Sequence, residues 1–317
     1  VFCWTYAVTR NFVLADGMKT AIVTGANRGI GYHIARKIGS SEGFQCVIAC
    51  RDKDQGLEVE DKLTQENCRA KFYQLDISDA ESINNFALEI SQDYGTVDIL
   101  VNNAAIGPSS PEVQGFSFPK QARRIMDVNF FGTAAVCDAV TPLLNEGGRI
   151  VNVTSEVGSI NLFAPRDAFE ELWNFTVGGG PNLKSQFRSK ELTREQLEEL
   201  MRKFVDDVEK GVHQANGWPN TAYAVSKFGV TVLTHLLARN PTFAENLITA
   251  NSCSPGPCRT DLSGNMGDRS AEEGGEVVAW LAMLDPYDED PSIERLAKIN
   301  GQMWMDKRTV RWTDGEK

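Results

Sequence analysis

Near residue 25 a strand, a glycine-rich turn and a helix follow one another directly, and this succession limits the folds open to the chain. A β-prone run over residues 19–24 leads into Gly25-Ala-Asn-Arg-Gly29-Ile-Gly31, and residues 32–38 have helical character. In such a unit Gly25 makes the tight turn, Gly29 lets the backbone approach a pyrophosphate, and Gly31 lets the helix pack closely on the strand. The helix N-terminus then faces the phosphates. The unit therefore predicts a dinucleotide-binding site.

Strands and helices keep alternating beyond this unit. Such alternation implies a parallel, doubly wound sheet with helices on both faces, and the near-continuous apolar strands fit a sheet that is covered on both sides. We therefore expect a single Rossmann-type α/β domain over residues 18–317. The predicted strands are residues 44–50, 71–75, 97–101 and 148–153, and the predicted helices are residues 55–63 and 83–90.

Charge and cysteine content exclude several kinds of partner and site. The net charge is −11, whereas binding to nucleic acid needs a basic face. The seven cysteines are scattered without a C-x-x-C pair and there are three histidines, so neither a disulfide framework nor a metal site is expected. No stretch is long and apolar enough to span a bilayer. We expect a cytoplasmic protein whose residues 1–17 are a disordered or non-native leader without the features of a signal peptide.

Two arginines near the glycine turn predict which dinucleotide binds. Arg51 ends the second strand, near the place where an acidic residue would bind the ribose 2′-hydroxyl of NAD(H). Arg28, inside the glycine turn, could reach the same point, and two guanidinium groups on one dianion favour NADP(H). The adjacent Asp52 keeps NAD(H) open as an alternative. At the end of the third strand, Asp76 is expected either to meet the adenine amino group or to cap a loop.

A tyrosine and a lysine four residues apart form a second constellation. Tyr223 and Lys227 lie in the segment Asn220-Thr-Ala-Tyr-Ala-Val-Ser-Lys, and the apolar run over residues 228–237 predicts a helix. On a helix, residues i and i+4 lie on one face. We expect the lysine charge to lower the pKa of Tyr223 and so to prepare it for proton exchange with a substrate oxygen. Alone, this pair also occurs by chance on helix surfaces.

Six motifs in order resemble the short-chain dehydrogenase/reductase superfamily along nearly the whole chain from Met18. Two places depart from the pattern. Ala105 stands in place of a glycine, which matters only if that residue needs a positive φ, and Pro257-Cys258 follows the Pro-Gly pair, where it could alter the loop over the nicotinamide. The motifs are Thr24-Gly25-Ala-Asn-Arg-Gly29-Ile-Gly31, Asn102-Asn103-Ala104-Ala105, Asp127-Val-Asn129-Phe-Phe-Gly132, Val151-Asn-Val-Thr-Ser155, Tyr223 with Lys227, and Pro255-Gly256 with Thr260.

The resemblance implies a catalytic tetrad of Asn129, Ser155, Tyr223 and Lys227. Tyr223 would be the general acid for the developing alkoxide, and Lys227 would hold the nicotinamide ribose. Ser155 would bind the carbonyl oxygen, and Asn129 would anchor a water that links the lysine to solvent. The neighbouring Thr154 is an alternative to Ser155, although the family register favours the serine.

The cofactor and substrate residues follow from the same motifs. We expect the substrate pocket to be formed by residues 106–107, by residues 156–160 and by the insertion with Trp218 before the catalytic helix. The thiol of Cys253 is expected either to react near the nicotinamide or to be a small buried side chain. The cofactor-binding residues are predicted to be Gly25, Asn27, Arg28, Gly29, Ile30, Gly31, Arg51, Asp76, Ile77, Asn103, Ala104, Tyr223, Lys227, Pro255, Gly256 and Thr260, and the substrate residues to be Ile106, Ser155, Trp218 and Tyr223.

A long insertion, residues 156–222, separates the serine from the tyrosine and is similar to that of the monomeric, NADPH-dependent carbonyl reductases of this superfamily. It predicts a helix that begins with a capping box of Thr193 and Gln196 and ends before Gly211. The resemblance implies that the insertion covers a helical face that other members use to assemble, so we expect a monomer. The apolar stripe of the helix is Leu197, Leu200, Met201, Phe204 and Val208.

The resemblance implies an enzyme that uses NADPH to reduce ketone, aldehyde or quinone carbonyls to alcohols or hydroquinones. One alternative is a reductase dedicated to a single bulky natural-product ketone. Another is a regulatory module that binds NADP(H) without catalysis. A Ser-His-Asp hydrolase is not indicated, because the chain contains no G-x-S-x-G motif.

Overall fold

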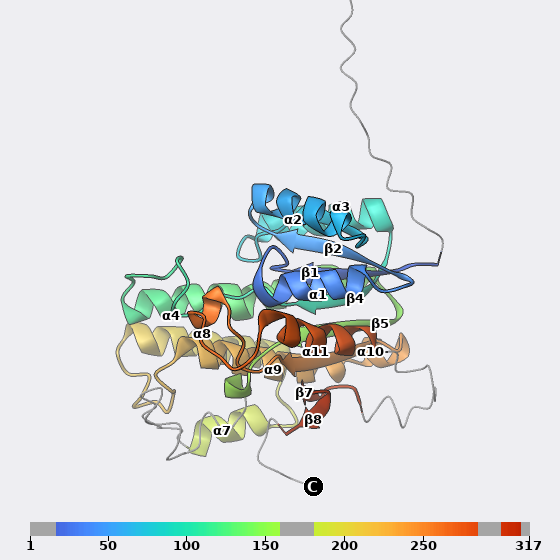
Figure 1. The fold of residues 1–317 in the computed structure, drawn as a ribbon. Helices are drawn as coiled ribbons and strands as arrows, with labels where there is room; N and C mark the ends of the chain where they lie inside the picture. The colour runs from blue at the N-terminus through green and yellow to red at the C-terminus, as the bar shows by residue number, and fades with distance from the viewer. Residues whose placement is uncertain (1–16, 159–180, 285–298, 312–317) are drawn as a thin grey trace, which may run out of the picture.

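An eight-stranded sheet forms the centre of the chain in a computed structural model that describes residues 17–158, 181–284 and 299–311. The strand order is β3-β2-β1-β4-β5-β6-β7-β8 (Figure 1). Neighbouring strands from β3 to β7 pair in parallel, and β8 pairs with β7 in the antiparallel sense. The strands are β1 Lys19–Thr24, β2 Phe44–Cys50, β3 Ala70–Gln74, β4 Val97–Asn102, β5 Leu144–Val153, β6 Thr249–Ser254, β7 Met303–Met305 and β8 Arg308–Val310.

The strand order reverses between β1 and β4, which confirms the predicted doubly wound sheet. After β3 the chain crosses back so that β4 lies beside β1. Each strand range predicted from the sequence falls on an observed strand, although β5 begins at Leu144, four residues before the predicted start. The leader over residues 1–16 and residues 159–180 of the insertion lie outside the described part of the chain.

Helices cover both faces of the sheet, each over its own hydrophobic cluster (Figure 1). Helices α1, α2 and α11 pack over one face, and α3, α5 and α9 over the other, with α4, α7 and α8 outside α9. The described helices are α1 Gly29–Gly39, α2 Lys53–Gln65, α3 Ala80–Tyr94, α4 Phe118–Met126, α5 Thr133–Val140, α7 Pro181–Arg188, α8 Arg194–Glu209, α9 Ala222–Ala238, α10 Pro241–Glu245 and α11 Ala271–Met283, with a π-helical turn over Asp127–Gly132.

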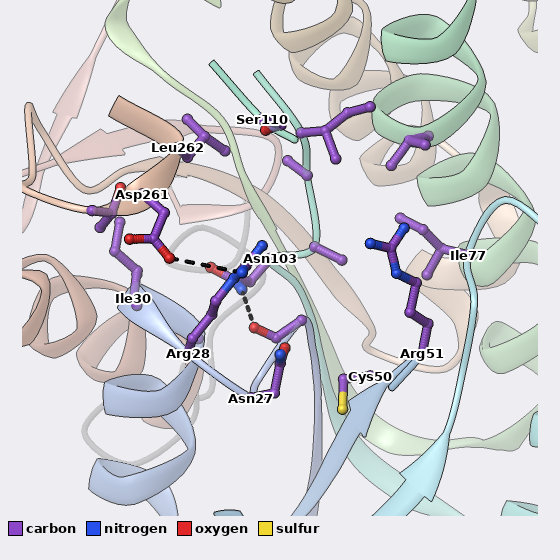
Figure 2. Close-up of a pocket in the computed structure, with 18 of the residues that line it drawn as sticks. Asn27, Arg28, Ile30, Cys50, Arg51, Ile77, Asn103, Ser110, Asp261 and Leu262 are labelled. Atoms are coloured by element: carbon purple, nitrogen blue, oxygen red, sulfur yellow. Dashed lines mark hydrogen bonds and ion pairs between the residues drawn. The ribbon is translucent and has the colours of Figure 1, made fainter. Parts of the chain in front are cut away.

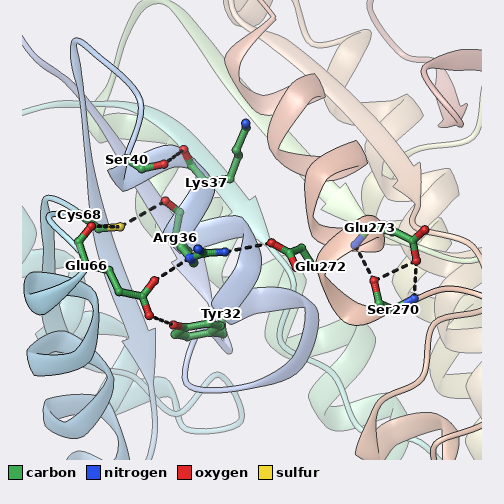
Figure 3. A network of polar contacts seen from close by, with 9 residues as sticks. All are labelled: Tyr32, Arg36, Lys37, Ser40, Glu66, Cys68, Ser270, Glu272 and Glu273. Carbon is green, nitrogen blue, oxygen red and sulfur yellow. Dashed lines mark hydrogen bonds and ion pairs between the residues drawn. The ribbon is translucent and has the colours of Figure 1, made fainter.

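A polar network ties α1 to its neighbours on the first face (Figure 3). The Tyr32 hydroxyl donates to Glu66 Oε1 at 3.0 Å, and Arg36 Nε donates to Glu66 Oε2 at 2.6 Å. The same guanidinium donates from Nη1 to Glu272 at 2.9 Å, in the first turn of α11. The network therefore links α1 to the end of α2 and to α11 at the surface.

The insertion helix forms as the sequence predicts. Thr193 and Gln196 make both hydrogen bonds of the capping box at the start of α8, and Gly211 follows the helix with a φ of +71°. The five residues of the predicted stripe are all buried. This stripe packs α8 against α4 and α9, so the insertion covers the outer side of the helical layer.

Trp218 fixes the end of the insertion to the domain. Its side chain is fully buried, and its ring lies edge-on to Phe187 and Phe204 with centroid distances of 6.0 Å and 5.3 Å. Its indole Nε1 donates to Asp207 Oδ2 at 3.1 Å. An aromatic ring in such a cluster contributes through both burial and ring geometry, so Trp218 joins α7, α8 and the start of α9 into one layer.

None of the helices in the described ranges has the length and apolar content needed to cross a membrane.

Replacing Trp218 with alanine should lower the free energy of unfolding by about 3–5 kcal/mol, because the substitution leaves a cavity between three elements. Urea denaturation followed by circular dichroism measures the change. The control is Leu88→Ala on α3, whose side chain is 60% exposed and whose loss should cost less than about 0.5 kcal/mol. Equal stabilities of the two variants would contradict the packing role of Trp218.

Candidate active site

A cavity of about 270 Å³ opens at the carboxyl ends of the parallel strands, where the strand order reverses (Figure 2). Doubly wound sheets bind ligands at this point. Most residues predicted to bind the dinucleotide line this cavity, and their role in binding stays a prediction. The predicted residues that line it are Gly25, Asn27, Arg28, Gly29, Ile30, Gly31, Arg51, Asp76, Ile77, Asn103, Ala104, Ile106, Tyr223, Lys227, Pro255 and Thr260.

The glycine turn is held against the end of β4. Thr24 Oγ1 accepts hydrogen bonds from the backbone amides of Asn103 and Ala104, both at 3.0 Å. In return Asn103 Nδ2 donates to the carbonyls of Thr24 and Gly25, at 2.9 Å and 3.2 Å. Gly25 and Gly29 have φ values of +64° and +55°, which glycine adopts without strain. Four hydrogen bonds therefore hold the turn to the end of β4, and both glycines line the cavity.

The Ala105 substitution puts no strain on this region. Ala105 is not among the described non-glycine residues with a positive φ. The departure from the family motif is therefore harmless to the backbone.

The start of α1 can receive an anion. Its N-cap residue, Arg28, makes no side-chain hydrogen bond to the first turn, and that turn contains no acidic residue. The uncapped amides of a helix N-terminus attract phosphate. The two predicted arginines stand on either side of the opening: Arg28 Nη1 lies 3.7 Å from Asp261 Oδ2, and Arg51 pairs with Glu112. Figure 2 shows both guanidinium groups at the cavity.

The acidic alternatives at this end have local partners. Asp52 is the N-cap of α2 and accepts from the Gln55 amide at 3.0 Å. Asp76 Oδ1 accepts from the amide and hydroxyl of Ser78 at 2.9 Å and 2.7 Å, so it caps a loop while it lines the cavity. Burial acts to raise the pKa of Asp76, but these hydrogen bonds and the charges of Arg124 and Arg51 hold it below its usual value.

Tyr223 and Lys227 share one face of α9, as predicted, and both line the cavity. Lys227 Nζ lies 5.9 Å from the centre of the Tyr223 ring and donates to the Val153 carbonyl at 2.8 Å. The expected lowering of the tyrosine pKa is wrong for the protein by itself. Burial raises the pKa of Tyr223 to about 12 and lowers the pKa of Lys227 to about 8. Removal from water disfavours both charged forms, so the phenol keeps its proton.

Asn129 lies in the π-helical turn between α4 and α5 and joins two parts of the site. Its Oδ1 accepts from the Ile106 amide at 2.9 Å, and its Nδ2 donates to the Ile106 carbonyl at 2.9 Å and to Ser226 Oγ at 3.0 Å. The Ser226 hydroxyl donates in turn to the Tyr223 carbonyl at 2.7 Å. Asn129 is buried behind the cavity and positions the loop after β4 relative to α9. Its predicted water stays a prediction.

Comparisons with known proteins agree with this geometry. A family model described as short chain dehydrogenase matches residues 19–164. Carbonyl reductase (NADPH) 1 of Rattus norvegicus is 39% identical over 94% of this chain and 100% of that protein. Carbonyl reductase (NADPH) 3 of Homo sapiens is 36% identical over 93% of this chain and 98% of that protein. The structure of salutaridine reductase from Papaver somniferum aligns with a TM-score of 0.73 and 26% identity, covering 91% of this chain and 99% of that one.

The chain belongs to the short-chain dehydrogenase/reductase family. Identity at this level along nearly the whole chain, together with the doubly wound fold, leaves no other assignment. The family that the six motifs predicted is thereby confirmed, and the roles of the individual motif residues stay predictions.

The two adjacent hydroxyls after β5 differ in position. Thr154 lines the cavity, and its buried Oγ1 has no hydrogen-bond partner among the described residues. Ser155, which the family register favours, is half-buried and precedes the short 3-10 helix Glu156–Gly158. It is not among the residues that line the cavity. The remainder of the predicted pocket loop, residues 159–160, lies outside the described residues.

At the substrate end the structure corrects one prediction, for Trp218, and decides between the two alternatives for Cys253. Trp218 is fully enclosed by the insertion and is not among the lining residues of the cavity, so it packs the fold and does not form a pocket wall. Cys253 is fully buried in β6, and burial raises the pKa of its thiol to about 12. Since the thiolate is the reactive form, Cys253 is a small buried side chain and not a nucleophile. Gly256 follows Pro255 with a φ of +77° but does not itself line the cavity.

Several lining residues were not found by sequence reasoning. Most of them lie on α2, on α4 or on the loops after β4 and β6, where neither periodicity nor a motif marks them, although Arg124 lies one turn before the Asp127-Val-Asn129 motif. The others carried a signal that was not used. Cys50 and Leu75 end predicted strands, and Val128 and Val153 lie inside two of the six motifs. The residues missed are Cys50, Gln55, Leu75, Ser110, Pro111, Glu112, Arg124, Val128, Val153, Asp261 and Leu262.

Within the described residues, no cluster of histidine, cysteine and acidic side chains has the arrangement of a metal site.

The buried lysine should give the stability a characteristic pH dependence. The pKa of Lys227 in the folded protein is about 8, below its ordinary value of 10.5, so between these values the unfolded chain binds more protons. The free energy of unfolding of the wild type should therefore rise, relative to that of Lys227→Met, by up to about 1.4 kcal/mol per pH unit from pH 8 to pH 10. Urea titrations at each pH measure the difference, and Lys37→Met at an exposed position is the control. A difference that stays constant across this range would contradict the burial argument.

Proposed function

We propose that this protein reduces the carbonyl group of ketones, aldehydes or quinones to the alcohol or hydroquinone, with NADPH as the hydride donor. The observation that carries the proposal is that Tyr223 and Lys227 line the same cavity as the glycine turn and the two arginines. Proton donor, ammonium group and phosphate-binding elements therefore face one space. The names of the full-length relatives, carbonyl reductase (NADPH) 1 and 3, support the same reaction.

The residues of the cavity fit a phosphorylated dinucleotide. The uncapped amides at the start of α1 suit the pyrophosphate, and the glycines leave its approach clear. Arg28 and Arg51 would hold the 2′-phosphate that distinguishes NADPH from NADH. Asp52, the residue that kept NAD(H) open, is engaged as the cap of α2. Lys227 would bind the hydroxyls of the nicotinamide ribose beside Tyr223.

Proton donation falls to Tyr223. When bound, NADPH supplies the hydride. With a pKa of about 12, Tyr223 carries its proton at neutral pH and can give it to the oxygen on which negative charge develops. The ammonium of Lys227 favours the phenolate that remains. A hydroxyl at the end of β5, Ser155 in the family register, would donate a hydrogen bond to the carbonyl oxygen.

The range of substrates distinguishes a broad carbonyl reductase from the nearest alternative, a reductase that accepts a single ketone. The structural likeness to salutaridine reductase favours, as a second candidate, a reductase with the same chemistry that is dedicated to one bulky ketone. Such an enzyme would bind NADPH and ignore small quinones. A module that binds NADP(H) without catalysis is disfavoured, because all four predicted tetrad residues are present.

We further propose that the protein is a monomer. Helix α8 packs on α4 and α9 and so covers their outer side. Light scattering after size-exclusion chromatography tests this, and a dimer would contradict it.

Tyr223→Phe should lower turnover at least about 100-fold while it leaves the Kd for NADPH nearly unchanged, because the substitution removes the proton donor and little else. Oxidation of NADPH at 340 nm with menadione, isatin and an aromatic aldehyde, with NADH in parallel, measures turnover. Fluorescence titration measures the Kd.

The matched control is Tyr73→Phe, which removes a hydroxyl that donates to Asp93, neither residue lining the cavity, and should leave turnover intact. Near-normal turnover by Tyr223→Phe would overturn the mechanism. Tight binding of NADPH by the wild type, without turnover of any of these substrates, would favour the dedicated reductase or the binding module.

A further inference from the structure

The loop between β4 and α4, residues 103–117, brings a carboxylate into the cofactor end of the cavity. Glu112 on this loop accepts a hydrogen bond from Arg51 Nη2 at the end of β2, and both residues line the cavity. The Glu112 side chain is 15% exposed, against 49% for Arg51. The carboxylate is thus mostly covered, while the guanidinium still reaches the opening.

The carboxylate of Glu112 is incompletely satisfied. Its Oε1 accepts from Arg51, but its Oε2 is buried and has no hydrogen-bond partner among the described residues. A buried acceptor without a donor costs free energy. Although burial acts to raise the pKa of Glu112, its own backbone amide and the charges of Arg51 and Arg28 hold it below its usual value. Glu112 is therefore an anion that is paired with Arg51, and the charge of Arg28 also favours its ionised form.

A 2′-phosphate and Glu112 compete for the same cation. The phosphate carries nearly two negative charges and three strong acceptor oxygens. Glu112 carries one negative charge and contacts Arg51 through a single oxygen, Oε1. Two anions on one guanidinium repel each other, so the phosphate binds fully only when the carboxylate moves away. The hydrogen bonds that close the turns of this loop, between Gly107 and Ser110 and between Ser110 and Val113, do not involve the Glu112 side chain, so the carboxylate can leave Arg51 without breaking them.

We propose that Glu112 is a specificity-determining residue of the cofactor site, an internal anion that occupies Arg51 until a 2′-phosphate displaces it. The inference rests on the proposed function, because it takes NADPH as the cofactor. NADH has no 2′-phosphate and leaves the Glu112–Arg51 pair intact. Glu112 therefore weakens the binding of NADPH and has little effect on the binding of NADH. As a result it reduces the preference of the site for NADPH over NADH.

The test uses the full chain and two fragments that differ by the phosphate alone, adenosine 2′,5′-bisphosphate and 5′-AMP, with Kd measured by isothermal calorimetry. Glu112→Gln keeps the shape of the side chain and an acceptor for Arg51 but removes the charge. It should lower the Kd for the bisphosphate about tenfold, equivalent to about 1.4 kcal/mol, and leave the Kd for 5′-AMP within about twofold. Binding of 5′-AMP also shows that the variant is folded.

The matched control is Asp54→Asn, which removes an exposed charge from the first turn of α2 that does not line the cavity. It should leave both Kd values within about twofold of wild type. An unchanged or higher Kd of the Glu112→Gln variant for the bisphosphate would overturn the competition, since a carboxylate that only orients Arg51 gives that result.

Arg51→Gln separates this inference from the proposed function. The variant should raise the Kd for the bisphosphate and leave that for 5′-AMP unchanged. If it does so while Glu112→Gln has no effect, the competition is wrong and the phosphate subsite stands. If Arg51→Gln leaves the bisphosphate affinity unchanged, the assignment of NADPH to this subsite fails and the competition fails with it.

Discussion

A methyl group added at Gly31 would lie 2.2 Å from the carbonyl oxygen of Gly25 and 2.4 Å from Nδ2 of Asn103. Helix α1 therefore reaches the ends of β1 and β4 only because this residue has no side chain. The same close approach lets Asn103 hold the turn from the neighbouring strand. This packing places the uncapped start of α1 at the cavity, and Arg36 on the same helix links it at the surface to the end of α2 and to α11.

Burial decides the proton chemistry at the other end of the cavity. A lysine near a phenol suggests mutual stabilisation of opposite charges, but that argument assumes that both groups remain hydrated. In the folded chain Lys227 donates to the Val153 carbonyl, and burial raises the pKa of Tyr223 to about 12 while it lowers the pKa of Lys227 to about 8. The result is a phenol that holds its proton, which suits a donor to a developing alkoxide.

At the cofactor end of the cavity the charged side chains remain partly in contact with water, unlike Tyr223 and Lys227. There the arginines are half exposed, and each already has an acidic partner from a different loop, Glu112 or Asp261. Local features of the chain predicted the arginines, because each stands at a defined place relative to a strand or a glycine. Their acidic partners escaped prediction, because the loops that carry them have no repeating pattern and their course depends on the strands that they join.

The sequence by itself determined the parts that depend on neighbouring residues. Near-continuous apolar runs predicted the strands, and the spacing of apolar residues predicted the stripe of α8. The capping box of Thr193 and Gln196 predicted where that helix begins, and the glycine spacing predicted the turn at Gly25. The order of the motifs identified the family. Each of these follows from interactions within a few residues of the chain.

Only the tertiary structure decided which side chains are buried and which residues far apart in the sequence contact one another. Trp218 could have been a pocket wall or a core ring, and its enclosure by Phe187 and Phe204 made it the latter. The state of the phenol at Tyr223 and the pairing of Arg51 with Glu112 were decided in the same way. Burial and pairing over long sequence separations arise when strands and loops pack together, so no local pattern contains them.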